Sequence, residues 1–93
     1  MKWIEIIRLR TFDHIRQTTV LELLRQLKTE LSATDVTLAL YHHTSIDTDL
    51  SIHLIWHSAI LEQGKSAIGT KLAYLLCEFG AVDYSVWIET FPF

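Results

Sequence analysis

The stretch VTLALYHHTSIDTDLSIHLIWHS, residues 36–58, decides the fold that the sequence predicts. Apolar residues alternate on both sides of a polar centre, and Ile46-Asp47-Thr48-Asp49 has the composition of a turn. We therefore predict strands at 36–44 and 50–58, joined as a hairpin. The even-numbered positions carry the larger apolar side chains, and we expect this row to face the core: Val36, Leu38, Leu40, Leu50, Ile52, Leu54 and Trp56.

Two helices and two further strands are predicted around this hairpin. Residues 2–10 are typical of a strand, and residues 13–32 repeat apolar side chains at helical spacing. A second helix is expected to begin at Ser66 and to end at Gly80, and 82–89 alternates as a strand. The apolar face expected on the second helix consists of Ile68, Leu72, Leu75, Leu76 and Phe79.

The resulting order, β-α-β-β-α-β, indicates an α+β, ferredoxin-like fold. Right-handed crossovers place both helices on one face of a four-stranded antiparallel sheet, with the first strand beside the third. The chain has 93 residues, so we expect 1–93 to form a single domain.

Odd-numbered strand residues are expected to face away from the helices. This row mixes large apolar side chains with histidines and carboxylates, a composition that suits the wall of a ligand cavity. Its expected members are Thr37, Ala39, Tyr41, His43, Ser51, His53, Ile55, His57, Asp83, Ser85, Trp87 and Glu89, with Trp3, Glu5, Ile7 and Leu9 from the first strand.

The order of elements and the segment IWHSAILEQGKSAIGTKLAYLL, residues 55–76, resemble the dimeric α/β-barrel superfamily, which includes the antibiotic-biosynthesis monooxygenase-like proteins. The resemblance implies two sheets packed face to face and a small-molecule cavity between each sheet and its helices or partner. Members include cofactor-free oxygenases, haem-degrading enzymes, isomerases and effector-binding modules. Many monooxygenase-like members carry a histidine where this chain has Gln63-Gly64-Lys65-Ser66, and an axial haem ligand on the second helix is absent. The family's catalytic residues therefore do not transfer, and we expect no cofactor.

The histidines raise the question of a metal. His53 and His57 have the spacing of a helical zinc pair, but four residues of strand span about 13 Å, too far for one ion. If Ile46 pairs with Leu50, His43 lies opposite His53, Tyr41 opposite Ile55, and Ala39 opposite His57. Two opposed imidazoles could share an ion, but no compact three-ligand motif is present, so we expect no metal.

An acid/base site is the stronger interpretation of the same residues. Because the first strand lies beside the third, Glu5 is expected near His53 or His57, and a carboxylate there would orient an imidazole acting as general base. Ligand contacts are expected from Tyr41, His43, Ile55, Trp87 and Trp3. The alternative is that these aromatic and apolar side chains fill a dimer interface.

Composition excludes several classes of partner. The formal net charge is −3, the pI is about 5.9, and no run of Lys or Arg provides the basic face that nucleic acid requires. Hydrophobic residues make up 49% of the chain, which indicates that a second copy covers part of its surface. Cys77 is the only cysteine, so an intrachain disulfide is impossible. We expect neither a signal peptide nor a membrane span, and therefore a cytoplasmic protein.

Two functions remain open from the sequence. The first is a homodimer without catalytic activity that binds a small organic ligand in a cavity on the sheet. The alternative is a cofactor-free monooxygenase-like or isomerase-like enzyme that uses His53 or His57 with Glu5 as its general base.

Overall fold

The computed structural model describes residues 2–32, 34–57 and 66–91 of the chain. Its elements follow the predicted order and are, in sequence, β1 (Trp3–Thr11), α1 (His14–Leu31), β2 (Val36–His42), β3 (Asp49–Trp56), α2 (Ala67–Leu76) and β4 (Gly80–Ile88).

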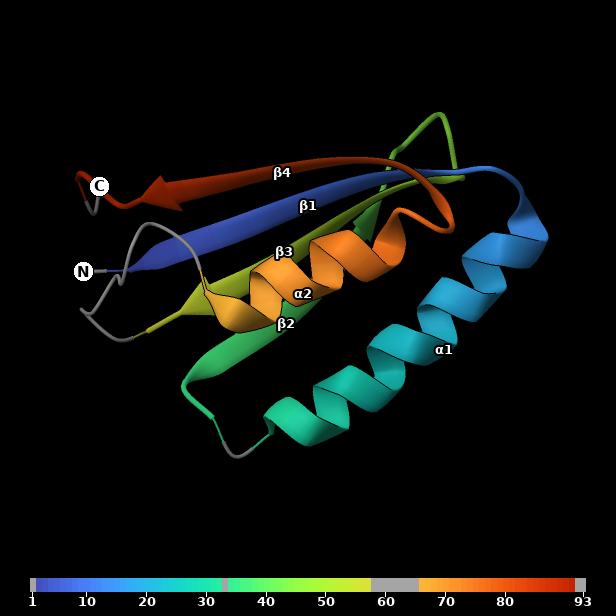
Figure 1. Ribbon diagram of the computed structural model, residues 1–93. Helices are drawn as coiled ribbons and strands as arrows, with labels where there is room; N and C mark the ends of the chain where they lie inside the picture. Colours follow the sequence, from blue (N-terminus) through green and yellow to red (C-terminus); the bar gives the residue numbers. More distant parts are fainter. Residues whose placement is uncertain (1, 33, 58–65, 92–93) are drawn as a thin grey trace.

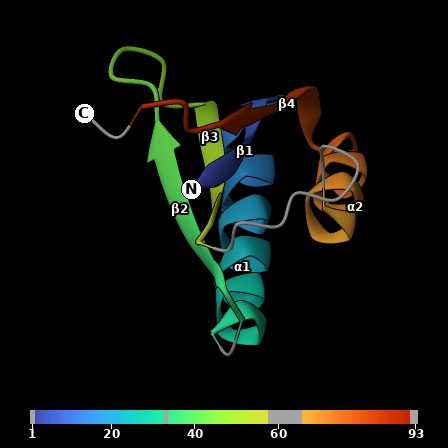
Figure 2. The same cartoon turned by 90° about the vertical axis from the view of Figure 1, so that its left-hand side faces the viewer.

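The strands form one antiparallel sheet in the order β2-β3-β1-β4, so β1 lies beside β3 as predicted. Figures 1 and 2 show both helices on the same side of this sheet, with its other side turned away from them. The α+β, ferredoxin-like fold expected from the hairpin is therefore confirmed. In the part of the chain that the structure describes, no helix combines the length and the hydropathy that a membrane crossing requires.

Both helices begin at side-chain caps. The Asp13 carboxylate accepts a hydrogen bond from the backbone N–H of Arg16 at 2.8 Å, and the Ser66 hydroxyl accepts one from the N–H of Gly69 at 2.8 Å. Such bonds satisfy amide groups that have no partner within the first turn. The sequence indicated Thr11 or Asp13 as the cap of the first helix and Ser66 as the cap of the second. Asp13 and Ser66 are the caps, and Thr11 is the last residue of β1.

Gly80 does not end the second helix in a left-handed conformation, so that prediction was wrong. The helix stops at Leu76, and Gly80 is the first residue of β4, paired with Thr11. A β-carbon added to Gly80 would overlap the carbonyl oxygen of Arg10. Glycine is needed there because the backbones of β1 and β4 approach closely, not because of its left-handed freedom.

The helix-facing side of the sheet consists of even-numbered residues in β2, β3 and β4, as predicted, but of odd-numbered residues in β1. Ile7 pairs with Ile52 on one side and Tyr84 on the other, and directly paired residues share a face. The prediction for β1 was therefore wrong. The physical reason is that the even-numbered row of β1 holds Arg8 and Arg10, which cannot be buried without cost, so the row with Ile7 faces the core.

The largest core cluster joins β1, β3 and both helices. Its buried members are Ile7, Leu9, Val20, Leu24, Leu50, Ile52, Leu72, Ala73 and Leu76. Leu75 was predicted to belong to this core but remains 38% exposed, because α2 turns Gly69 and Ala73 toward the sheet instead.

Candidate functional site

The side of the sheet opposite the helices, which we call the outer face, is organised as four rows that run across the strands. Antiparallel pairing places the members of each row side by side. From the amino end of β1 the rows are Thr37-Ile55-Ile4-Trp87, Ala39-His53-Ile6-Ser85, Tyr41-Ser51-Arg8-Asp83 and Asp49-Arg10-Ala81. The first two rows form an apolar end and the last two a charged end.

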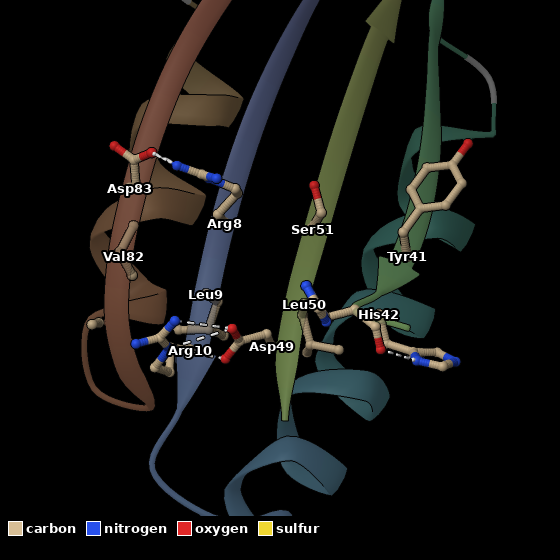
Figure 3. A pocket seen from close by; sticks show the side chains of 12 residues that line it. Arg8, Leu9, Arg10, Tyr41, His42, Asp49, Leu50, Ser51, Val82 and Asp83 are labelled. Carbon is tan, nitrogen blue, oxygen red and sulfur yellow. Dashed lines mark hydrogen bonds and ion pairs between the residues drawn. The ribbon is translucent and has the colours of Figure 1, made fainter. Parts of the chain in front are cut away.

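Two adjoining hollows lie on the outer face. One, of about 370 Å³, is lined by Ile6, Arg8, Ser51, His53, Asp83, Ser85 and Trp87. The other, of about 380 Å³, is shown in Figure 3 and extends toward Tyr41, His42, His43 and Arg10. Arg8, Ser51 and Asp83 line both hollows, so the two adjoin, and we refer to them together as the depression on the outer face. Each volume is large enough for a small organic molecule.

His53 lies in the second row, between Ala39 on β2 and Ile6 on β1. Its Nε2 lies 2.9 Å from the hydroxyl of Ser51, and its ring lies against Tyr41 with centroids 4.8 Å apart. Partial burial lowers the pKa of His53 below its ordinary value of 6.5, because desolvation disfavours the imidazolium. The imidazole is therefore neutral at physiological pH and can donate or accept a hydrogen bond.

Trp87 closes the apolar end of the depression. Its Nε1 donates to the Ser85 hydroxyl at 2.9 Å, which fixes the indole over the strand, while 58% of the residue stays exposed. Tyr41 is 54% exposed on the opposite edge strand. Large aromatic side chains held this open are suited to contact a ligand or another protein surface.

The charged end is internally balanced. Arg8 lies 2.9 Å from Asp83, and Arg10 lies 3.0 Å from Asp49 (Figure 3). Each arginine thus faces a carboxylate on a neighbouring strand. The two pairs cancel in charge, so the depression has no strong preference for either sign of ligand.

The predicted pairing of the histidines was wrong. Ala39, not His43, lies opposite His53, and Tyr41 lies opposite Ser51. His43 lies in the loop after β2, where its Nδ1 accepts hydrogen bonds from the N–H groups of Ser45 and Ile46. His43 and His53 are therefore not placed opposite each other, the arrangement in which two imidazoles could have shared an ion.

His57 lies beyond the end of β3 and is not opposite Ala39. Its N–H donates to the carbonyl of Asp35 at 3.3 Å, and its Nε2 lies 3.0 Å from the Thr37 hydroxyl. Across residues 2–32, 34–57 and 66–91, no three His, Cys, Asp or Glu side chains gather closely enough to hold a metal ion.

Glu5 and Trp3 are on the helix-facing side, so neither contributes to the depression on the outer face. Glu5 pairs with Leu54 and Val86, whose side chains point toward the helices, and its exposure is 0%. The predicted contact of Glu5 with His53 or His57 is therefore wrong. The error follows directly from the reversed parity of β1.

Glu5 instead forms a buried hydrogen-bond network that sequence reasoning missed. Its Oε1 accepts hydrogen bonds from Trp56 Nε1 at 2.7 Å and from the Ser66 hydroxyl at 2.5 Å. Its Oε2 accepts from the Ser66 N–H at 3.2 Å and from the hydroxyl of Tyr84. All four groups are donors toward the carboxylate, the arrangement that an ionised carboxylate requires. The network ties β1 to β3, β4 and the start of α2.

Three aromatic side chains lie at this network, and two of them, Trp56 and Tyr84, donate hydrogen bonds to Glu5. Trp3 stacks on Trp56 with centroids 5.1 Å apart and an angle of 8° between the rings. Trp3 is 5% exposed, and its Nε1 is buried with no hydrogen-bond partner among the described residues. On β4, burial and the hydrogen bond to Glu5 raise the pKa of Tyr84, so its phenol stays protonated.

A separate apolar hollow of about 400 Å³ lies between the two helices. It is lined by Leu23, Gln26, Leu27, Glu30, Leu31, Ile68, Lys71, Leu72 and Leu75. This helix hollow shares no lining residue with the depression on the outer face. A substitution in the helix hollow and one in the depression on the outer face can therefore show which of the two holds a bound ligand.

Comparison with known proteins supports the fold. The chain is similar to the structure described as "Structure of Rv0793 from Mycobacterium tuberculosis". The TM-score is 0.69 and the sequence identity 18%, over 98% of this chain and 97% of the other. No protein-family model matches the chain, and no curated protein matches it. At this identity the likeness establishes the fold alone.

Proposed function

We propose that this protein is a homodimer whose two sheets pack through their outer faces, and that it binds a small, uncharged, flat organic ligand in the depression beside Trp87 and His53. The observation that carries the proposal is a sheet face, opposite the helices, on which Trp87 and Tyr41 are each more than half exposed. A sheet face that meets only water usually carries polar side chains. Here the first row across the sheet is Thr37, Ile55, Ile4 and Trp87.

Charge on the outer face supports a second copy as the covering partner. An interface around a twofold axis brings the same surface against itself and must be self-complementary. Arg8 and Arg10 are balanced by Asp83 and Asp49, so two copies would meet without net repulsion. In such a dimer, Arg8 and Arg10 of one copy could also pair with Asp83 or Asp49 of the other.

The size of the outer face is also adequate. Four strands spaced by about 4.8 Å, with about eight residues of 3.3 Å each, span roughly 500 Å² of flat area per copy. Two copies together would bury about 1,000 Å² before the relief of the side chains is added, which meets the minimum expected of a biological interface.

The chemistry of the depression indicates the class of ligand. The Trp87 indole provides a flat surface, and the hydroxyls of Ser51 and Ser85 lie in the same hollow as the neutral His53. Arg8 and Asp83 are already paired with each other. A planar compound with hydroxyl or carbonyl groups would match these side chains better than an ion would.

We include membership in the dimeric α/β-barrel superfamily, close to its monooxygenase-like members, in this proposal. It is supported by the segment at residues 55–76 and by the fold shared with the mycobacterial structure. The alternative of a histidine and carboxylate base is less well supported, because Glu5 lies on the other side of the sheet from His53.

The dimer is tested by analytical ultracentrifugation. We expect a dimer at micromolar concentration, and we expect Ile6→Glu, in the second row of the outer face, to produce a folded monomer. Tyr74→Glu is the matched control, because Tyr74 is 79% exposed on α2, away from the outer face. A monomeric wild-type protein would refute the proposal.

Ligand binding is tested by thermal shift with neutral flat probes such as naphthol and flavone. We expect stabilisation of the wild-type protein and loss of that response in Trp87→Ala. Leu75→Gln, in the helix hollow, should respond as the wild type does. Loss of the response in Leu75→Gln but not in Trp87→Ala would place the ligand between the helices and contradict the site proposed here.

A further inference from the structure

We propose that acidification dissociates the dimer because a proton taken up by His53 cannot be accommodated in the closed interface. This inference rests on the proposed function, since it requires two outer faces to meet. It assigns to His53 a regulatory role in the assembly and in the ligand site that the assembly would close.

The position of His53 makes it sensitive to a covering surface. It lies on β3, one of the two inner strands, within the second row of the outer face, flanked by Ala39 and Ile6. One side of its ring is against Tyr41, and its Nε2 is engaged with the Ser51 hydroxyl. A second copy packed over these rows would remove the remaining water from the imidazole.

The charged groups around His53 offer its protonated form no compensation. From β1 it is approached by Arg8, and from β2 by the neutral phenol of Tyr41. The carboxylates on β3 and β4, Asp49 and Asp83, are already bound to Arg10 and Arg8. Among the described strand residues of the outer face, no carboxylate is left to pair with an imidazolium.

The other histidines near this face are less suited to the role. His57 is exposed beyond the end of β3, and His43 is exposed in the loop after β2. Both would keep access to water at the margin of the interface. Desolvation already holds the pKa of His53 below 6.5 in the single chain, and further burial acts in the same direction.

Proton linkage gives the direction in which pH changes the dissociation constant of the dimer, and an upper limit to that change. The dimer contains the neutral imidazole, so lowering the pH favours the monomer, which can take up the proton. An imidazole with the ordinary pKa of 6.5 would favour the monomer roughly 30-fold at pH 5, and two of them roughly 1,000-fold. Because the pKa of His53 in the single chain is lower than 6.5, we expect the dissociation constant to rise by less than this limit.

The test is sedimentation equilibrium of the full chain at pH 7.5 and pH 5, with circular dichroism at both values. We expect a dimer at pH 7.5 and, at pH 5, a folded monomer or a dimer with a measurably larger dissociation constant. His53→Gln cannot titrate and should remain equally dimeric at both values. His14→Gln, on α1, should keep the pH response of the wild type.

The outcomes separate this inference from the proposed function. A monomer at pH 7.5 would overturn both. A dimer of equal strength at both pH values, or a His53→Gln variant that dissociates as the wild type does, would overturn the role of His53 alone. If the wild-type protein unfolds at pH 5 and does not dissociate into folded monomers, the role of His53 is overturned as well. If His53→Gln fails to fold, His53→Asn takes its place. An NMR titration of the wild-type His53 ring, at protein concentrations below and above the dissociation constant, then decides the question.

Discussion

Gly69 on α2 lies directly against the carboxylate of Glu5 on β1, so closely that a β-carbon at Gly69 would overlap Oε2. The absence of a side chain at this position allows the start of the helix to reach the buried carboxylate. The N–H of Gly69 also donates to the Ser66 hydroxyl, which in turn donates to Glu5. The start of α2 therefore packs closely against the Glu5 carboxylate and is hydrogen-bonded to it through Ser66.

Gly69→Ala should destabilise the fold. In an ordinary helix this change stabilises by about 0.5–1 kcal/mol, because glycine is the poorer helix former. Here we expect a loss of about 1–3 kcal/mol from overpacking against Glu5. Urea denaturation provides the measurement, with Lys71→Ala, exposed in the same helix, as the control. A stabilising Gly69→Ala would show that the helix can move away from β1 without cost.

Glu5→Gln should lower the free energy of unfolding by roughly 2–4 kcal/mol, because one carboxylate oxygen becomes an NH₂ group that faces donors and leaves them unpaired. The same urea titration measures it. Glu22→Gln, exposed on α1 in a surface ion pair, should change stability by less than about 1 kcal/mol. Equal effects at the two positions would mean that water enters the Glu5 network.

The destabilisation caused by substitutions at Ser66 should not follow the usual preference of helix caps. Aspartate is normally as good a helix cap as serine, yet Ser66→Asp would place a second carboxylate against Glu5. We expect Ser66→Asp to be more destabilising than Ser66→Ala, which itself should cost about 1–2 kcal/mol. At the other cap, Asp13→Ser should be close to neutral. Thermal denaturation of these variants tests the order, and a well-tolerated Ser66→Asp would contradict it.

Tyr84 should make the protein sensitive to alkali. Its pKa in the folded state is raised, so the folded protein holds the phenolic proton more tightly than the unfolded chain, whose tyrosines titrate near pH 10. The contribution of Tyr84 to stability is therefore complete below about pH 10 and is lost as the pH rises above it. Urea midpoints at pH 9 and pH 11 should differ less in Tyr84→Phe than in the wild type. Tyr74→Phe, at an exposed position, should leave the difference unchanged.

The features predicted correctly from sequence are those that local signals determine. The hairpin around Asp47, the helix caps Asp13 and Ser66, and the helix-facing parity of the even-numbered residues in β2, β3 and β4 depend on neighbouring residues only. At the sheet edges this face is not fully covered, since Leu40 is 39% and Ile88 53% exposed. Element order then followed from the positions of these signals along the chain.

Two features could not be predicted in the same way: the register of the hairpin between β2 and β3, and the face of β1 that turns to the core. The His43 N–H donates to the Asp49 carbonyl, and its Nδ1 accepts from two loop N–H groups, so the hairpin loop is longer than the turn residues alone indicated. The register shifts with it: His53 pairs with Ala39, and His43 and His57 lie outside the paired strands. In β1, the odd-numbered row was expected to face away from the helices, as the odd-numbered rows of the other strands do. Glu5 is instead buried because donors arrive from Trp56, Ser66 and Tyr84, which no local pattern reveals.

The hydrogen bonds of Glu5 also constrain how the chain folds. Their donors lie 51, 61 and 79 positions away along the sequence, so the carboxylate cannot be satisfied within the first half of the protein. A partly folded chain that placed β1 in a core would leave this charge without partners, at a cost that favours returning it to solvent. Burial of the first strand must therefore await the third strand, the second helix and the last strand, which makes the folding transition more cooperative and slower than the length of the chain alone implies.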